Sequence, residues 1–147
     1  MIWLPRKTIV VPIDFSDDSF SALDTSQELV DSPQHLHLIH VLPIITPNDP
    51  GVIWEMIDEQ SRAAHAEEAL QTKLAARQTE GSRIVIRFGD PGHQITDYAQ
   101  EIHADLIVLS SHGQTGLTRL LLGSVAEKVV RLAHCPVLVL KKGLGIE

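Results

Sequence analysis

The chain has 147 residues, of which 44% are hydrophobic and 21% are charged, and its formal net charge is −7. This length and composition predict one globular domain over residues 1–147 and exclude a disordered chain. The acidic balance argues against nucleic acid as a general partner, and no apolar run approaches the roughly 18 residues that span a membrane. Cys135 is the only cysteine, which excludes intrachain disulfides and favours a reducing, cytoplasmic location.

In chain order, the first predicted element is a buried strand over residues 8–14, a β-branched run that ends in Asp14. Helix-start chemistry at Ser16 predicts a helix whose apolar stripe reaches residue 30. A second strand is predicted over residues 35–42. Three prolines in the next nine residues indicate an irregular flap over residues 43–51.

The same alternation continues along the rest of the chain. A long helix is predicted over residues 52–80, with Gly81 ending it, and a third strand over residues 83–88. The remaining predicted elements are a turn at 89–92, a short helix at 94–102, a strand at 105–110, a helix at 124–133 and a strand at 136–140. Five strands alternating with four helices predict an α/β fold, a doubly wound, five-stranded parallel sheet in the order 3-2-1-4-5 with helices on both faces.

The most informative segment is the loop between the fourth strand and the last helix, residues 110–124. It contains Gly113, and Gly123 and Ser124 stand where the next helix is expected to start. Because these residues are small, a ligand can approach the backbone closely. Helix N-termini favour anions, so the loop predicts a phosphate site, with Ser124 as the N-cap and Glu127 completing a capping box. The alternative is that Gly123 and Ser124 only begin a helix.

Asp14 is expected to face this loop, because ligands of doubly wound sheets lie beyond the carboxyl ends of the strands where the strand order reverses. Its carboxylate is a candidate acceptor for ribose hydroxyls, or else it only forms a turn. Arg119 is either a phosphate contact or a surface cation, and Lys128 is predicted to be a surface residue. His112 is the one histidine expected near the ligand, where it would shape the loop.

Other chemistries find little support in the residues. Walker, Rossmann and nucleophile-elbow motifs are absent, so no catalytic residue is predicted. His35 and His37 share one strand face, but the chain has no recognisable metal-ligand spacing, so no metal site is predicted. Cys135 precedes a buried strand, which favours packing over reactivity.

Six segments together resemble the universal stress protein family over nearly the whole chain. They are residues 9–14, 40–41, 89–91, 105–109, 110–125 and 135–139. The resemblance implies an adenine nucleotide alpha hydrolase-like fold and, for one branch of the family, ATP binding. The nucleotide pattern of that branch fits Gly113, Gly123 and Ser124. Its first glycine falls on Ser110, a departure that we expect to alter affinity more than abolish it.

The resemblance also implies a role for each matching residue. Asp14 would meet the ribose, and Ser110 and Gly113 would lie beside the ribose and the phosphates. The other predicted site residues are Pro12, Ile13 and Val41 around the adenine, Gly123, Ser124 and Val125 on the phosphates, and Leu109 and His112. Mg²⁺ on the phosphates is compatible with this site, although the sequence shows no dedicated ligand set for it.

The family resemblance further implies a homodimer that pairs the last strands, residues Val137 to Leu140. An apolar edge strand near the chain end independently favours such pairing. The leading hypothesis is an ATP-binding stress-response protein that acts as a nucleotide-dependent switch or partner-binding module. A slow ATPase or self-phosphorylating enzyme, and a dimerisation module that binds no nucleotide, are the alternatives.

Overall fold

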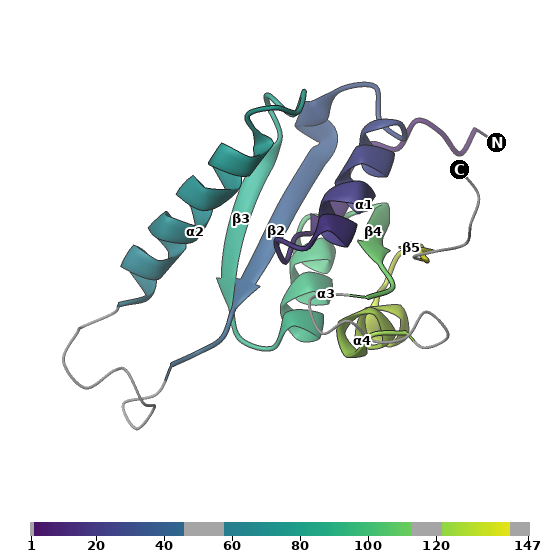
Figure 1. Cartoon of the computed structure of the whole chain (residues 1–147). Coiled ribbons are helices and arrows are strands. Elements are labelled where there is room, and N and C mark those ends of the chain that lie inside the picture. Colours follow the sequence, from purple (N-terminus) through teal and green to yellow (C-terminus); the bar gives the residue numbers. More distant parts are fainter. Residues whose placement is uncertain (1, 46–57, 113–121, 142–147) are drawn as a thin grey trace.

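The computed structural model describes residues 2–45, 58–112 and 122–141, and Figure 1 shows its layout. The strands are β1 (Ile9–Pro12), β2 (Leu36–Leu42), β3 (Arg83–Phe88), β4 (Leu106–Ser110) and β5 (Val137–Leu140). The helices are α1 (Asp17–Gln27), α2 (Glu59–Leu74), α3 (Pro91–Glu101) and α4 (Ser124–Leu132), and a short 3₁₀ turn, Pro33–His35, precedes β2. None of the described helices is long and apolar enough to cross a membrane.

The strands form one parallel sheet in the order β3-β2-β1-β4-β5, which confirms the predicted fold and strand order. Ile9 of β1 aligns with Leu36 of β2 on one side and with Leu106 of β4 on the other. The strand order therefore reverses between β1 and β4. Chain segments that leave these two strands diverge there, which leaves room at the carboxyl edge of the sheet.

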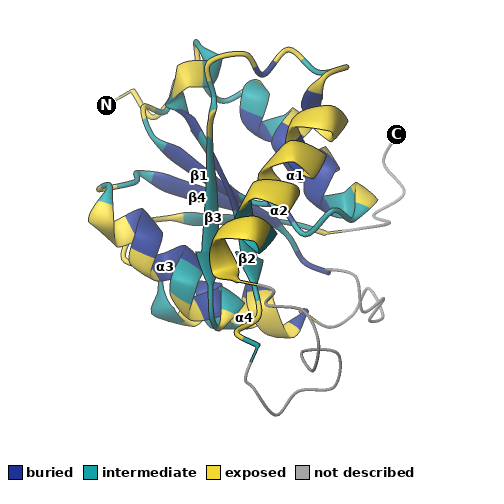
Figure 2. Ribbon diagram, turned by 90° about the vertical axis from the view of Figure 1, so that its left-hand side faces the viewer, coloured by how far each residue is buried: buried dark blue, intermediate teal, exposed yellow. Residues whose placement is uncertain are grey.

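Successive residues of β1 point to opposite faces of the sheet and feed two separate cores. Ile9 and Val11 pack on the side of α1 and α2, whereas Val10 packs on the side of α3 and α4. All three are fully buried, and burying an aliphatic side chain stabilises the fold by about 1.5–3 kcal/mol. Figure 2 shows β1 and β4 mostly in dark blue between helices whose outer faces are exposed.

Two helices are shorter than the sequence predicts. α1 ends at Gln27, and Leu29 and Val30 pack against the core from outside the helix. α2 ends at Leu74 rather than at residue 80. Gly81 has a left-handed φ of 96° in a later turn, so it does not end the helix as predicted. The predicted helical residues 52–57, and residues 46–51 of the predicted flap, lie outside the described part of the chain.

Two helix starts also differ from the prediction. α3 begins at Pro91 instead of residue 94, because Asp90 accepts a hydrogen bond from the backbone N–H of His93 and Pro91 suits the first helical position. In α4 the N-cap is Gly123, and Ser124 is the first helical residue, with no side-chain hydrogen bond at the cap. The predicted capping box is therefore wrong.

Candidate functional site

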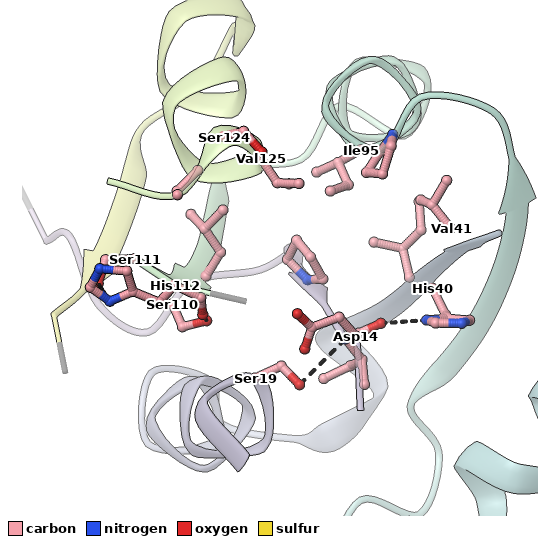
Figure 3. A pocket seen from close by; sticks show the side chains of 17 residues that line it. Asp14, Ser19, His40, Val41, Ile95, Ser110, Ser111, His112, Ser124 and Val125 are labelled. Carbon is pink, nitrogen blue, oxygen red and sulfur yellow. Dashed lines mark hydrogen bonds between the residues drawn. The ribbon is translucent and has the colours of Figure 1, made fainter. Parts of the chain in front are cut away.

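A cavity of about 170 Å³ opens at the carboxyl ends of β1 and β4, where the strand order reverses (Figure 3). It is lined by Pro12, Ile13, Asp14, Ser19, Ile39, His40, Val41, Pro91, Ile95, Leu109, Ser110, Ser111, His112, Gly123, Ser124, Val125 and Ala126. The structure thus brings together every predicted site residue that it describes. Gly113, like Arg119, lies outside the described residues.

Asp14 lies two residues beyond the end of β1 and is held in a fixed orientation by the turn that leads into α1. One of its carboxylate oxygens, Oδ1, accepts hydrogen bonds from both the backbone N–H and the hydroxyl of Ser16. The backbone N–H of Asp14 donates to Ser19 Oγ at 3.3 Å. Between them, Phe15 has a left-handed backbone with φ of 67°, a conformation that costs about 1–3 kcal/mol in a bulky residue. Asp14 therefore forms a turn and also presents its carboxylate to the cavity (Figure 3).

The end of β4 is shaped by three consecutive polar residues. The Ser110 hydroxyl donates to the carbonyl oxygen of His112 at 2.7 Å, and Ser111 Oγ lies 3.2 Å from His112 Nδ1. Ser111 and His112 are buried, with 2% and 3% of their surface exposed. The Ser111 carbonyl accepts a 2.6 Å hydrogen bond from the backbone N–H of Gly123. These contacts connect the end of β4 to the start of α4, and the loop-shaping role of His112 stays a prediction.

The N-terminus of α4 differs from the other helix starts. Ser16, Asp58 and Asp90 cap α1, α2 and α3 with side-chain oxygens, whereas Gly123 offers α4 no side chain. The first N–H groups of a helix have no carbonyl partner within it, and they carry the positive end of its dipole. Because Gly123, Ser124 and Val125 all line the cavity, this end of the cavity suits a negatively charged group.

The opposite end of the cavity is apolar. Val41 and Ile95 lie on the right-hand side of the view in Figure 3, away from Ser110. His40 lies beside them, and its Nδ1 is 2.6 Å from the carbonyl oxygen of Ile13. A carbonyl oxygen only accepts, so His40 carries its proton on Nδ1. The cavity therefore has an apolar end, a carboxylate along one wall and an uncapped helix start at the other end.

Seven lining residues were missed from the sequence. They are Ser19, Ile39, His40, Pro91, Ile95, Ser111 and Ala126. Pro91 and Ile95 were not predicted because residues 89–92 were expected to form a turn. In the structure a helix starts at residue 91, and its first turns lie at the carboxyl edge of the sheet. The pattern of a strand followed by the Asp90-Pro91 pair, a helix-start signal, could have identified them.

One ion pair joins the two helices that wall the cavity. Lys128 of α4 places Nζ 3.2 Å from both carboxylate oxygens of Asp90, and its side-chain stem crosses Gly92 of α3. The hydrogen bond from the His93 ring, the backbone N–H of His93 and the nearby Lys128 together lower the pKa of Asp90 to about 2. Lys128 is partly exposed, as predicted for a surface residue, but it also contacts both Asp90 and Gly92 across the interface of α3 and α4.

Metal and thiol chemistry find no support in the described residues. No group of three or more histidine, cysteine, aspartate or glutamate side chains within residues 2–45, 58–112 and 122–141 could hold a metal ion. Burial raises the pKa of the Cys135 thiol, and Cys135 packs against the core under α3 and α4. The described lining of the cavity combines the backbone at the start of α4, the carboxylate of Asp14 and several apolar side chains.

The fold and this cavity define an α/β protein with a cavity at the switch point of a parallel sheet. The family model described as "Universal stress protein family" matches residues 5–141. The chain therefore belongs to the universal stress protein family, as its sequence motifs predict.

Individual relatives agree with this assignment. The chain is 37% identical to Universal stress protein MJ0531 of Methanocaldococcus jannaschii, over 92% of this chain and 82% of that protein. Among solved structures it is similar to the universal stress protein UspA from Lactobacillus plantarum, with 30% identity, a TM-score of 0.71 and coverage of 92% and 99% of the two chains. It also matches the universal stress protein from Archaeoglobus fulgidus in complex with dAMP, with 25% identity, a TM-score of 0.54 and coverage of 96% and 100%.

Proposed function

We propose that the protein binds ATP in the cavity between β1 and β4 and acts as a nucleotide-dependent switch or partner-binding module of the cytoplasm. The observation that carries this proposal is the arrangement of three unlike surfaces around one cavity. An uncapped helix start, the Asp14 carboxylate and an apolar end suit a phosphate group, a sugar hydroxyl and a base, respectively.

A solved relative supports the nucleotide class. The structure of the Archaeoglobus fulgidus universal stress protein is of its complex with dAMP, an adenine nucleotide. In the present chain we assign the base to the apolar end around Val41 and Ile95, and the phosphates to the backbone N–H groups at the start of α4. Gly123, Ser124 and Val125 provide that start, and Asp14 lies between the two ends.

The proposal is tested first by what the protein carries when it is purified. Protein purified without added nucleotide is denatured and the released small molecules are identified by chromatography and mass spectrometry. Titration calorimetry then measures binding of ATP, with GTP and inorganic phosphate as comparisons. The proposal predicts released or bound adenine nucleotide, and it fails if nothing is released and millimolar ATP does not bind.

A matched pair of substitutions at Gly123 tests the phosphate assignment. Its φ of −64° and ψ of 159° are accessible to any residue, so Gly123→Asp and Gly123→Asn both introduce a capping side chain without backbone strain. Only aspartate adds a negative charge beside the assigned phosphates. At about 5 Å and an effective dielectric constant of about 20, two unit charges repel by about 3 kcal/mol, or roughly 100-fold in affinity.

The pair has a clear expected outcome. Gly123→Asp weakens ATP binding by roughly 100-fold, Gly123→Asn weakens it much less, and neither variant is less stable than the wild type by more than a few tenths of a kcal/mol. Equal loss in both variants means that bulk, and not charge, disturbs the site. If both bind ATP like the wild type, the phosphates do not lie at α4.

Mg²⁺ is proposed to enter with the phosphates. Because the described residues offer no three-ligand cluster, the ion would be held mainly by phosphate oxygens and water. Calorimetric titrations of ATP with and without Mg²⁺, and with EDTA, measure this contribution. Equal affinities under the three conditions would exclude it.

A homodimer through β5 is proposed as the assembly of the chain. β5 is an edge strand of the sheet, and it hydrogen-bonds to β4 through the carbonyls of Pro136 and Leu140. In a parallel ladder, alternate residues face opposite sides, so Val137 and Val139 direct their backbone N–H and C=O groups to the open edge. Those groups form a template for a second copy of the strand.

A further inference from the structure

We propose, building on the nucleotide function above, that the Ser110 hydroxyl accepts a hydrogen bond from the sugar of the bound nucleotide. The protein would then bind a nucleotide with the vicinal diol of ribose more tightly than one whose sugar lacks a hydroxyl. By the resemblance drawn from the sequence, Ser110 falls where the nucleotide pattern has a glycine, so its side chain sets this chain apart from that pattern. It is the last residue of β4 and lines the cavity.

The hydrogen bonds of Ser110 determine what its hydroxyl can recognise. The hydroxyl has a single proton, and that proton is donated to the carbonyl oxygen of His112 at 2.7 Å. Its oxygen can therefore only accept a hydrogen bond from a ligand. Phosphate oxygens are themselves acceptors and gain nothing from it, whereas a sugar hydroxyl is a donor. The Ser110 side chain is thus suited to the sugar and not to the phosphates.

The position of Ser110 in the cavity agrees with this assignment. β1 and β4 are adjacent strands, and both Ser110 at the end of β4 and Asp14 just beyond β1 line the cavity. Figure 3 shows Ser110 and Asp14 flanking the region below Ser124 and Val125. Asp14 is a second acceptor, oriented by the two hydrogen bonds that Ser16 donates to Oδ1. Two acceptors beside the carboxyl ends of neighbouring strands match the two donor hydroxyls of ribose.

The serine needs no unusual backbone to reach this position. Among the described residues, the left-handed non-glycine positions are Phe15 and His103, and Ser110 is not one of them. Replacing it with glycine therefore relieves no backbone strain, and the consequence of the serine comes from its hydroxyl. A side chain that only narrowed the cavity would weaken all nucleotides alike, whereas an acceptor distinguishes between sugars.

The experiment compares ATP, 2′-deoxy-ATP and 3′-deoxy-ATP by titration calorimetry on wild-type protein and on variants of Ser110. One lost hydroxyl-to-acceptor hydrogen bond corresponds to about three- to tenfold in affinity. We expect ATP to bind the wild type about three- to tenfold more tightly than at least one deoxy analogue. Ser110→Ala should bring that ratio close to one by weakening ATP alone, and Ser110→Thr, which keeps the hydroxyl, should preserve it. Ser124→Ala, at the assigned phosphate end, should leave the ratio unchanged.

The outcomes separate this inference from the function on which it rests. If wild-type protein binds none of the three nucleotides, the proposed function fails and the inference with it. If ATP binds but Ser110→Ala changes all affinities by the same factor, or tightens them, the nucleotide function stands and the sugar-reading role of Ser110 is overturned. An unchanged ratio in Ser110→Ala overturns it equally.

Discussion

The contact between α3 and α4 makes a sharp prediction about Gly92. A Cβ atom at this position would lie 2.5, 2.7 and 2.8 Å from Cδ, Cγ and Cβ of Lys128, all below normal contact. The nearest atoms belong to a flexible stem, but Lys128 Cβ is fixed to the helix and cannot move away. Overpacking of this kind costs about 1–3 kcal/mol, and the better helix propensity of alanine returns up to about 1 kcal/mol.

Gly92→Ala should therefore destabilise the protein by about 1–2 kcal/mol, equivalent to roughly 2–8 °C in melting temperature. Urea unfolding followed by circular dichroism measures this, and a double-mutant cycle with Lys128 identifies the cause. Lys128→Ala removes the two closest atoms and should recover about 1 kcal/mol in the double variant, whereas Lys128→Met keeps the stem and should recover little. If Gly92→Ala is as stable as the wild type, or if alanine and methionine at residue 128 rescue equally, the steric explanation is wrong.

Three further predictions concern pH and assembly. Burial, reinforced by Arg83, lowers the pKa of His37 below its usual 6.5, so the unfolded chain binds more protons and the free energy of unfolding should fall as pH drops below 6.5. His37→Phe should flatten this slope in urea unfolding measured from pH 7 to pH 5, and an unchanged slope would contradict the assignment. The pKa of Asp90 is lowered from 3.8 to about 2, so its ionised carboxylate stabilises the folded state. This stabilisation is fully present above pH 3.8 and is lost as pH falls toward 2. Asp90→Asn should remove that component of acid unfolding, and an acid profile identical to the wild type would exclude it. Val139→Pro removes one backbone N–H that points to the open edge of β5 and leaves the hydrogen bonds between β5 and β4 in place. Sedimentation should therefore show monomers for Val139→Pro and dimers for the control Val139→Ile. A dimeric Val139→Pro variant would place the interface elsewhere.

The sheet could be predicted because its signals are local and repeated. Each strand is a short apolar run between helix signals, and the alternation alone constrains the order of strands. The candidate site followed from the same topology, since Ser110 ends β4 and Asp14 lies just beyond the end of the neighbouring strand β1. Their side-chain hydrogen bonds to Ser16 and His112 could not be predicted, because these depend on the conformation of each turn.

The errors fall where local patterns compete with each other. Ser124 and Glu127 have the spacing of a capping box, yet Gly123 takes the cap position because its N–H is bound to the carbonyl of Ser111. The contact of Lys128 with Asp90 and Gly92 joins residues 38 and 36 positions apart in the chain, and no pattern within one helix reveals it.

The bare cap of α4 has a thermodynamic consequence. A helix start without a capping side chain opens more readily than a capped one. An anion that binds there accepts the hydrogen bonds that a cap would accept, and so stabilises the first turn. Ligand binding and the order of the first turn of α4 would then be a single equilibrium, in which stability rises by RT ln(1 + [L]/Kd). Amide hydrogen exchange at Val125 and Ala126 would report site occupancy directly, and through the Lys128–Asp90 pair the same signal would reach the start of α3.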